Sequence, residues 1–235
     1  MTTSTAPAPA LSLSQARFNM IEQQIRPWEV LDARVLALLD RVHREQFVPA
    51  AHQSLAFADM ELPLNHPAVD GQAMLAPKVE ARLLQDLALK PSDKVLEIGT
   101  GSGHMAALLA SLAQRVVSIE IDEALARLAR ENLQKAGITN AEVRCADAAA
   151  KGFAACADGA PFDAIVLSGS VAEIPSALLD LLAPGGRLGA IVGFEPMMRA
   201  TIVTRTGEAA FQTAQPWDTV APRLRHFPEP SRFRF

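Results

Sequence analysis

Short β-branched runs alternate with helical patterns from residue 91 onward, and this alternation constrains the fold more than any other feature. Five apolar runs predict strands, at 94–98, 116–121, 141–145, 163–168 and 187–192. Four helical patterns lie between them, the third of them weak, at 105–114, 123–135, 148–156 and 174–182. Apolar strands separated by helices are typical of a parallel sheet covered on both faces. The sequence therefore predicts an α/β fold, doubly wound around a mostly parallel sheet.

The pattern changes near both ends of this region. Residues 201–204 and 211–213 are expected to form an antiparallel pair around Gly207, which completes a sheet of the seven-stranded type. The arginine-dotted tail after Pro222 has no predicted element. Before residue 91 the pattern is helical and irregular, with Asp32 as the expected N-cap of one amphipathic helix. We therefore expect three parts, namely a disordered leader at 1–16, a helical cap at 17–90 and the α/β core at 91–235.

The composition removes several classes of function. The chain has 235 residues, of which 49% are apolar, and a net charge of −4, which offers no broad attraction to nucleic acid or anionic lipid. It has no tyrosine, and Cys145 and Cys156 lack histidine neighbours at ligand spacing, so we expect no metal and two reduced, mostly buried thiols. Neither a membrane span nor a secretory signal is visible, which predicts a cytoplasmic protein.

A glycine-rich loop follows the first predicted strand of the core. The run reads VLEIGTGSG over 95–103, and its glycines allow the backbone to turn tightly and approach a ligand. Glu120 ends the second strand, 21 residues beyond Gly99, and Asp147 follows the third. An acidic residue at the end of the second strand can accept hydrogen bonds from both ribose hydroxyls. The arrangement predicts a nucleoside ligand.

The spacing of the glycines and the charge beside them select among nucleosides. Dinucleotide-binding loops read G-x-G-x-x-G and face a pyrophosphate, whereas this loop reads G-x-G-x-G and follows Glu97. A carboxylate there would repel a pyrophosphate but would suit the ammonium group of S-adenosyl-L-methionine. A nicotinamide-dependent dehydrogenase is therefore disfavoured.

Four segments together carry a resemblance to a known family. They read REQFVPAAHQSLAFADMELPL in the cap and, in the core, VLEIGTGSGHMAALLA, VVSIEIDEALARLARENL and PFDAIVLSGSVAEIPSALLDLLAPGGRLGAIVG. In this combination the chain resembles the protein-L-isoaspartate O-methyltransferases, a group of class I methyltransferases. The resemblance covers roughly residues 17–220 and is strong through Gly193. It implies a Rossmann-like core, protein repair by carboxyl methylation, and S-adenosyl-L-methionine as methyl donor with S-adenosyl-L-homocysteine as product.

The resemblance also implies which residues hold the cofactor. Those around the methionine moiety would be Glu97, Gly99, Gly101 and Gly103. Glu120 would hold the ribose. The adenine would meet Asp147 and the Ala148 backbone, and Thr100 and Ile121 are further expected cofactor-binding residues. Met74 and Leu75 would line the mouth beside the sulfonium.

The chain departs from the family pattern where the methyl group would be transferred. The family has a serine where this chain has Leu75, so we assign no catalytic side chain. A carboxylate acceptor is already a nucleophile at neutral pH, and positioning supplies most of the rate. The missing hydroxyl nevertheless predicts a more apolar acceptor and weak or no turnover of isoaspartyl peptides. An alternative of another class is a non-catalytic cofactor sensor or interaction protein derived from the enzyme.

Two further residues are candidates near the acceptor, which would be a protein or peptide carboxylate or a small carboxylate. Asp59 could orient a substrate amide or cap a loop, and Ser168 could face the crevice or be an ordinary strand-end residue. His104 directly follows the glycine loop and is interpreted as a residue of the first helical turn, with ligand contact as the alternative.

Overall fold

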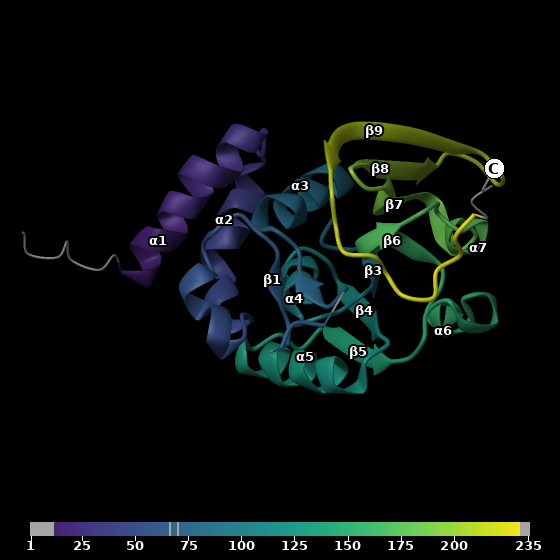
Figure 1. The fold of residues 1–235 in the computed structure, drawn as a ribbon. Coiled ribbons are helices and arrows are strands. Elements are labelled where there is room, and N and C mark those ends of the chain that lie inside the picture. The colour runs from purple at the N-terminus through teal and green to yellow at the C-terminus, as the bar shows by residue number, and fades with distance from the viewer. Residues whose placement is uncertain (1–11, 66, 70, 231–235) are drawn as a thin grey trace, which may run out of the picture.

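The computed structural model describes residues 12–65, 67–69 and 71–230. Its centre is a seven-stranded sheet with the order β5-β4-β3-β6-β7-β8-β9 (Figure 1). The strands are β3 (Lys94–Ile98), β4 (Arg115–Glu120), β5 (Ala141–Cys145), β6 (Phe162–Val171), β7 (Leu182–Phe194), β8 (Met197–Arg205) and β9 (Phe211–Thr219). Strands β3 to β7 pair in parallel, and β8 and β9 add antiparallel to β7. The predicted mostly parallel, seven-stranded α/β fold is confirmed.

Alternate residues of the central strands enter two hydrophobic cores on opposite faces of the sheet. Val95 and Val116 pack in the core that contains α3 (Pro77–Leu87), α4 (His104–Ala110) and α5 (Glu123–Lys135). Their strand neighbours Leu96 and Val117 pack on the other face, where α6 (Ala154–Ala157) and α7 (Ser176–Leu179) lie. Because successive side chains of a strand point to opposite faces, a sheet covered on both sides must be apolar throughout. For this reason the strands could be predicted from continuous apolar runs in the sequence.

Several predicted helices are shorter in the structure than expected. The helix expected at 148–156 is a 3-10 turn, Ala150–Gly152, followed by α6, with a break at Phe153, whose φ is +66°. The helix expected at 174–182 is only α7, because Leu182 instead pairs with Phe162 and begins β7. The helix expected at 105–114 begins at His104 and ends at Ala110 as α4.

The prediction that both cysteine thiols are mostly buried holds for only one of them. Cys156 is buried in the α6–α7 core, as expected, and burial raises the pKa of its thiol to about 12. Cys145 is exposed, because it is the last residue of the edge strand β5, which pairs only with β4. The expectation of a buried thiol was therefore wrong for Cys145.

The N-terminal cap consists of short helices and one small hairpin. In chain order the elements are α1 (Leu13–Met20), a π-helix (Ile21–Ile25), a 3-10 turn (Arg26–Trp28), α2 (Ala33–Arg41), 3-10 turns (Arg44–Gln46 and Ala50–Leu55), β1 (Leu62–Pro63) and β2 (Ala73–Met74). Asp32 caps α2 as predicted, accepting from the Arg34 backbone N–H at 2.8 Å. The cap shares the hydrophobic core of α3, α4 and α5, so it packs directly on the sheet domain. The division at residue 90 stays a prediction.

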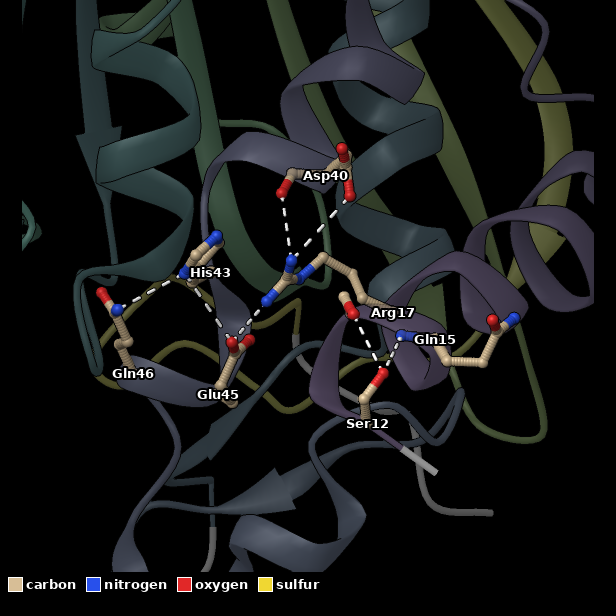
Figure 2. A network of polar contacts seen from close by, with 8 residues as sticks. Ser12, Gln15, Arg17, Asp40, His43, Glu45 and Gln46 are labelled. Atoms are coloured by element: carbon tan, nitrogen blue, oxygen red, sulfur yellow. Dashed lines mark hydrogen bonds and ion pairs between the residues drawn. The ribbon is translucent and has the colours of Figure 1, made fainter. Parts of the chain in front are cut away.

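A buried arginine, Arg17, links the first helix of the cap to the rest of the cap. Ser12 caps α1, so the predicted leader at 1–16 is too long at its end; residues 1–11 lie outside the described residues. Arg17, on α1, pairs with Glu45 at 2.5 Å and donates to the Asp40 carbonyl at 3.4 Å (Figure 2). This contact joins α1 to the segment after α2. No helix in the described part of the chain is long and apolar enough to span a bilayer.

Candidate functional site

A cavity opens at the carboxyl ends of β3, β4 and β5, where open α/β sheets bind their ligands. The glycine loop, the ends of β4 and β5, part of β6, the segment at the start of β2 and the tail after β9 all contribute to its lining. The lining residues include Ile98, Gly99, Gly101, Glu120, Ile121, Ala146, Asp147, Ala148, Ser168, Gly71, Gln72, Ala73, Arg223, Leu224, Arg225 and Phe227. Segments far apart in the sequence thus converge on one site.

Two glycines of the loop have positive φ angles and close neighbours, so a side chain is disfavoured at both positions. Gly99 has a φ of +94°, and a Cβ there would lie 2.8 Å from the Cδ2 atom of Leu224. Gly103 has a φ of +87°, and a Cβ there would lie 3.2 Å from the carbonyl oxygen of Ala129 on α5. Gly99 therefore shapes the cavity, whereas Gly103 allows close packing between the loop and α5 and does not line the cavity.

The two predicted acids, Glu120 and Asp147, both reach the cavity. Glu120 is buried, and its two carboxylate oxygens accept hydrogen bonds from the backbone N–H groups of Gly101 at 2.8 Å and Asp122 at 3.0 Å. Asp147 accepts from the Ala149 N–H at 3.0 Å, and its other oxygen lies 2.7 Å from His226 Nδ1. Ile121 and Ala148 line the cavity beside them. Glu120 therefore also braces the glycine loop.

Glu97 differs from its prediction. It is fully buried beneath the loop and does not line the cavity; Ser168 Oγ donates to one carboxylate oxygen at 2.7 Å and Ser118 Oγ lies 2.6 Å from the other. Burial raises the pKa of Glu97 to about 8, against the opposing effect of the two serine hydroxyls. The expected ionised carboxylate beside the ligand is thus a buried group, whose raised pKa favours its neutral form at pH 7.

A second, smaller cavity adjoins the first and contains the predicted residues Met74, Leu75 and Thr100. It shares Ala73, Gly99, Gly101 and Ser168 with the first cavity, so the two are contiguous. Met74 and Leu75 are both buried, and the Leu75 carbonyl accepts from Arg44 Nη2 at 2.8 Å. The Leu75 side chain thus contributes apolar surface at the place where the family has serine.

Three buried ionisable side chains meet beside this smaller cavity. Arg44 Nη1 donates to Glu80 Oε2 at 2.6 Å, and His104 Nδ1 lies 2.9 Å from the same oxygen. The prediction that His104 belongs to the first turn of a helix is confirmed. Its partners were missed, because they lie 60 and 24 residues earlier in the chain and carry no local pattern.

The tail after β9, for which no element was predicted, lines the cavity through Arg223, Leu224, Arg225 and Phe227. The Leu224 N–H donates to the Ser170 carbonyl at 2.9 Å, which holds the tail along β6. Phe227 is buried against Phe153, with ring centroids 5.4 Å apart. The free volume left in the cavity is about 70 Å³, whereas small-molecule pockets run to roughly 300–1,000 Å³.

A groove of about 700 Å³ lies on the other side of the tail and of the segment before β2. It shares Gly71, Gln72, Ala73 and Arg223 with the first cavity. Arg223 is the only lysine or arginine among the described residues that line it, and Glu61, Glu195 and Glu229 are its acids. Arg223 Nη2 donates to the Gly193 carbonyl at 2.7 Å, and Nη1 is buried without a partner among the described residues.

The two predicted acceptor-site residues take different positions. Ser168 lines both cavities, although β6 continues three residues beyond it, so it is not at the strand end. Asp59 does not line the cavities or the groove. It accepts from the Lys78 backbone N–H at 3.1 Å and pairs with Lys78 Nζ at 3.0 Å, at the start of α3. This geometry is that of a cap, one of the two alternatives considered for Asp59.

The family model and the curated relatives that match this chain all belong to one methyltransferase family. The sequence profile of the protein-L-isoaspartate(D-aspartate) O-methyltransferase family matches residues 15–219. The chain is 39% identical over 203 residues to protein-L-isoaspartate O-methyltransferase 2 of Marinobacter nauticus, covering 86% of this chain and 89% of that protein. It is 44% identical over 177 residues to the protein-L-isoaspartate O-methyltransferase of Methanoculleus marisnigri, covering 75% and 77%.

The solved structures agree in fold. The chain is similar to a protein-L-isoaspartate O-methyltransferase structure from Plasmodium falciparum in complex with S-adenosyl-L-homocysteine, with a TM-score of 0.70 and 20% identity. That likeness covers 88% of this chain and 98% of the other.

Proposed function

This chain belongs to the protein-L-isoaspartate(D-aspartate) O-methyltransferase family, and we propose that it transfers a methyl group from S-adenosyl-L-methionine to the carboxylate of an isoaspartyl residue in a protein or peptide. One observation carries the proposal: the region that matches the family contains the loop, the two acids and the segment before β2 that together line one cavity. The nicotinamide-dependent dehydrogenase considered above is excluded by this membership.

The cavity residues suit S-adenosyl-L-methionine. Gly99 provides a surface that a side chain would fill, and Glu120 retains lone pairs for ribose hydroxyls beyond its two backbone hydrogen bonds. Ile121 and Ala148 supply apolar contacts for the adenine, with Asp147 as a polar partner. We propose these residues, with Gly101, Met74 and Leu75, as the cofactor site. Glu97, Thr100 and Gly103 support the loop from outside the larger cavity.

The chain's own contribution to the reaction is positioning. When bound, S-adenosyl-L-methionine supplies an activated methyl group that a carboxylate oxygen can take by in-line displacement. An acceptor carboxyl with an ordinary pKa near 4 is ionised at pH 7, so no side chain has to remove a proton. The buried side chains of Met74 and Leu75, with the partly buried Leu224, form apolar walls that keep water from the reacting groups.

Arg223 is our proposed partner for the acceptor carboxylate. It lies at the junction of the groove and the cofactor cavity, and its buried Nη1 donor is unused. A guanidinium can bind a carboxylate through charge-assisted hydrogen bonds. We expect Arg223→Met to raise KM for an isoaspartyl peptide at least tenfold and to change the Kd of the cofactor less than twofold. The matched control is Arg199→Met, because Arg199 lies on β8 in an exposed pair with Asp218.

Radiolabelled methyl transfer tests the function itself. Two peptides of one sequence, one with isoaspartate and one with aspartate at the same position, serve as acceptors. We expect label on the isoaspartyl peptide alone, at a rate lowered by the apolar Leu75 wall. Binding of S-adenosyl-L-methionine with no label on either peptide or on lysate proteins would refute the enzyme assignment and favour the non-catalytic alternative.

A further inference from the structure

Arg44, Glu80 and His104 form a buried cluster of ionisable side chains beside the site. Their relative exposures are 2%, 3% and 2%, and they come from three elements, the 3-10 turn Arg44–Gln46, α3 and α4. Burying charged groups is costly unless each is paired. Such a cluster next to the glycine loop calls for a functional explanation.

The proton positions within the cluster follow from the donors and acceptors. Burial alone would raise the pKa of Glu80, but His104 and Arg44 outweigh burial and keep this pKa below its ordinary value. The Glu80 carboxylate is then an acceptor only, and Arg44 is a donor only. His104 Nδ1 lies 2.9 Å from Glu80 Oε2 and 3.3 Å from Arg44 Nη1, so the shorter contact places the proton on Nδ1. This leaves Nε2 as the free end of the ring.

His104 Nε2 is buried and has no hydrogen-bond partner in the described part of the chain. A buried polar atom without a partner is destabilising, so its site normally receives water or a ligand group. His104 lines the smaller cavity, which is contiguous with the larger one through Gly99, Gly101 and Ser168. That cavity is the space where a partner for Nε2 can lie.

The direction of the cofactor determines which of its groups arrives there. Asp147, Ala148 and Ile121 line only the larger cavity, on the side of Glu120. With the adenosine held on that side, the amino-acid end of an elongated ligand lies toward the smaller cavity. This step rests on the cofactor site proposed above.

We propose that His104 is a cofactor-binding residue whose Nε2 donates a hydrogen bond to the carboxylate of S-adenosyl-L-methionine, with Glu80 and Arg44 as positioning residues. In this arrangement both ring nitrogens donate, Nδ1 to Glu80 and Nε2 to the ligand carboxylate, which is the hydrogen-bonding pattern of a doubly protonated ring. The buried cluster then holds two cations, Arg44 and His104, and two carboxylates. An ammonium group in the same place would leave the cluster with an excess of positive charge, which is unfavourable in a buried site.

Calorimetric titration of two ligands into three proteins tests the proposal. The ligands are S-adenosyl-L-methionine and its decarboxylated form, which keeps the ammonium and sulfonium groups. The proteins are the wild type, His104→Asn, whose amide can still meet Glu80 but cannot reach the Nε2 position, and His104→Gln, whose longer side chain can.

We expect His104→Asn to weaken S-adenosyl-L-methionine roughly 10- to 100-fold, the range for a hydrogen bond to a charged group, and His104→Gln to weaken it less. Both variants should bind the decarboxylated ligand within twofold of the wild type. An equal loss for both ligands, or no loss for S-adenosyl-L-methionine, would overturn the role of His104 and leave the proposed function intact. A wild-type protein that binds neither ligand would instead refute the proposed function.

Discussion

Glu97→Gln removes the ionisation of a buried carboxyl while keeping the shape of its side chain. Burial raises the pKa of Glu97 from 4.5 to about 8. Because the folded pKa lies above the unfolded one, the native state holds the proton more tightly. The contribution to stability is fully present below pH 4.5 and is lost as the pH rises toward 8, since the unfolded chain ionises first.

The structure sets the size of this effect. The interval between 4.5 and about 8, at about 1.36 kcal/mol for each pH unit, corresponds to a contribution on the order of 5 kcal/mol. Most of it falls between pH 5 and pH 8. The glutamine variant does not titrate, so its free energy of unfolding relative to the wild type should increase by roughly 4 kcal/mol over that range.

Urea unfolding at pH 5 and pH 8, with linear extrapolation to water, measures the difference. The other titrating groups are common to both proteins and cancel in the comparison. Glu142→Gln is the matched control: Arg144 and Arg115 lower the pKa of this exposed carboxyl to about 2, so it is ionised in both states throughout the range. Its difference from the wild type should not change with pH. The same flat profile for Glu97→Gln would refute a neutral Glu97 in the folded protein.

Three other substitutions have defined outcomes. Gly99→Ala should lower the melting temperature more than Gly137→Ala does. Both glycines have a positive φ, but only at Gly99 would the added Cβ meet a neighbouring side chain, that of Leu224. Equal decreases in melting temperature would mean that backbone strain alone accounts for the effect. Arg17→Met should cost roughly 3 kcal/mol in urea unfolding, because it leaves the largely buried Glu45 carboxylate with only His43, 3.8 Å away. Arg26→Met, which breaks an exposed pair, should cost below about 1 kcal/mol; equal costs would argue against a stabilising role for the buried pair. Leu75→Ser should raise kcat/KM for an isoaspartyl peptide several-fold with little change in cofactor Kd, and unchanged kinetics would show that the missing hydroxyl does not limit this enzyme.

Most of the strand pattern and part of the site could be predicted because their signals are local. The bounds of β3, β5 and α5 match the prediction. Glu120 and Asp147 could be placed at the cavity because the carboxyl ends of parallel strands meet at one edge of the sheet. Asp32 was recognised as a cap because capping depends on a few neighbouring residues.

Other parts could not be predicted because they depend on contacts between distant segments. The hydrogen bonds that place Leu224 along β6 involve residues about 50 positions apart. Leu182 was predicted to end a helix but instead begins β7, where pairing with β6 buries it fully. Neither outcome has a signal in the residues nearby.

The sequence by itself determined the α/β alternation, the tight glycine loop and the presence of two acids at its edge, since these follow from backbone conformation and strand order. Only the tertiary structure decided that Glu97 is buried with a raised pKa, that the tail lines the cavity and that His104 shares a carboxylate with Arg44. The physical reason is that protonation and pairing depend on burial and on nearby charges. Both are set by the folded chain, in which residues far apart in sequence come into contact.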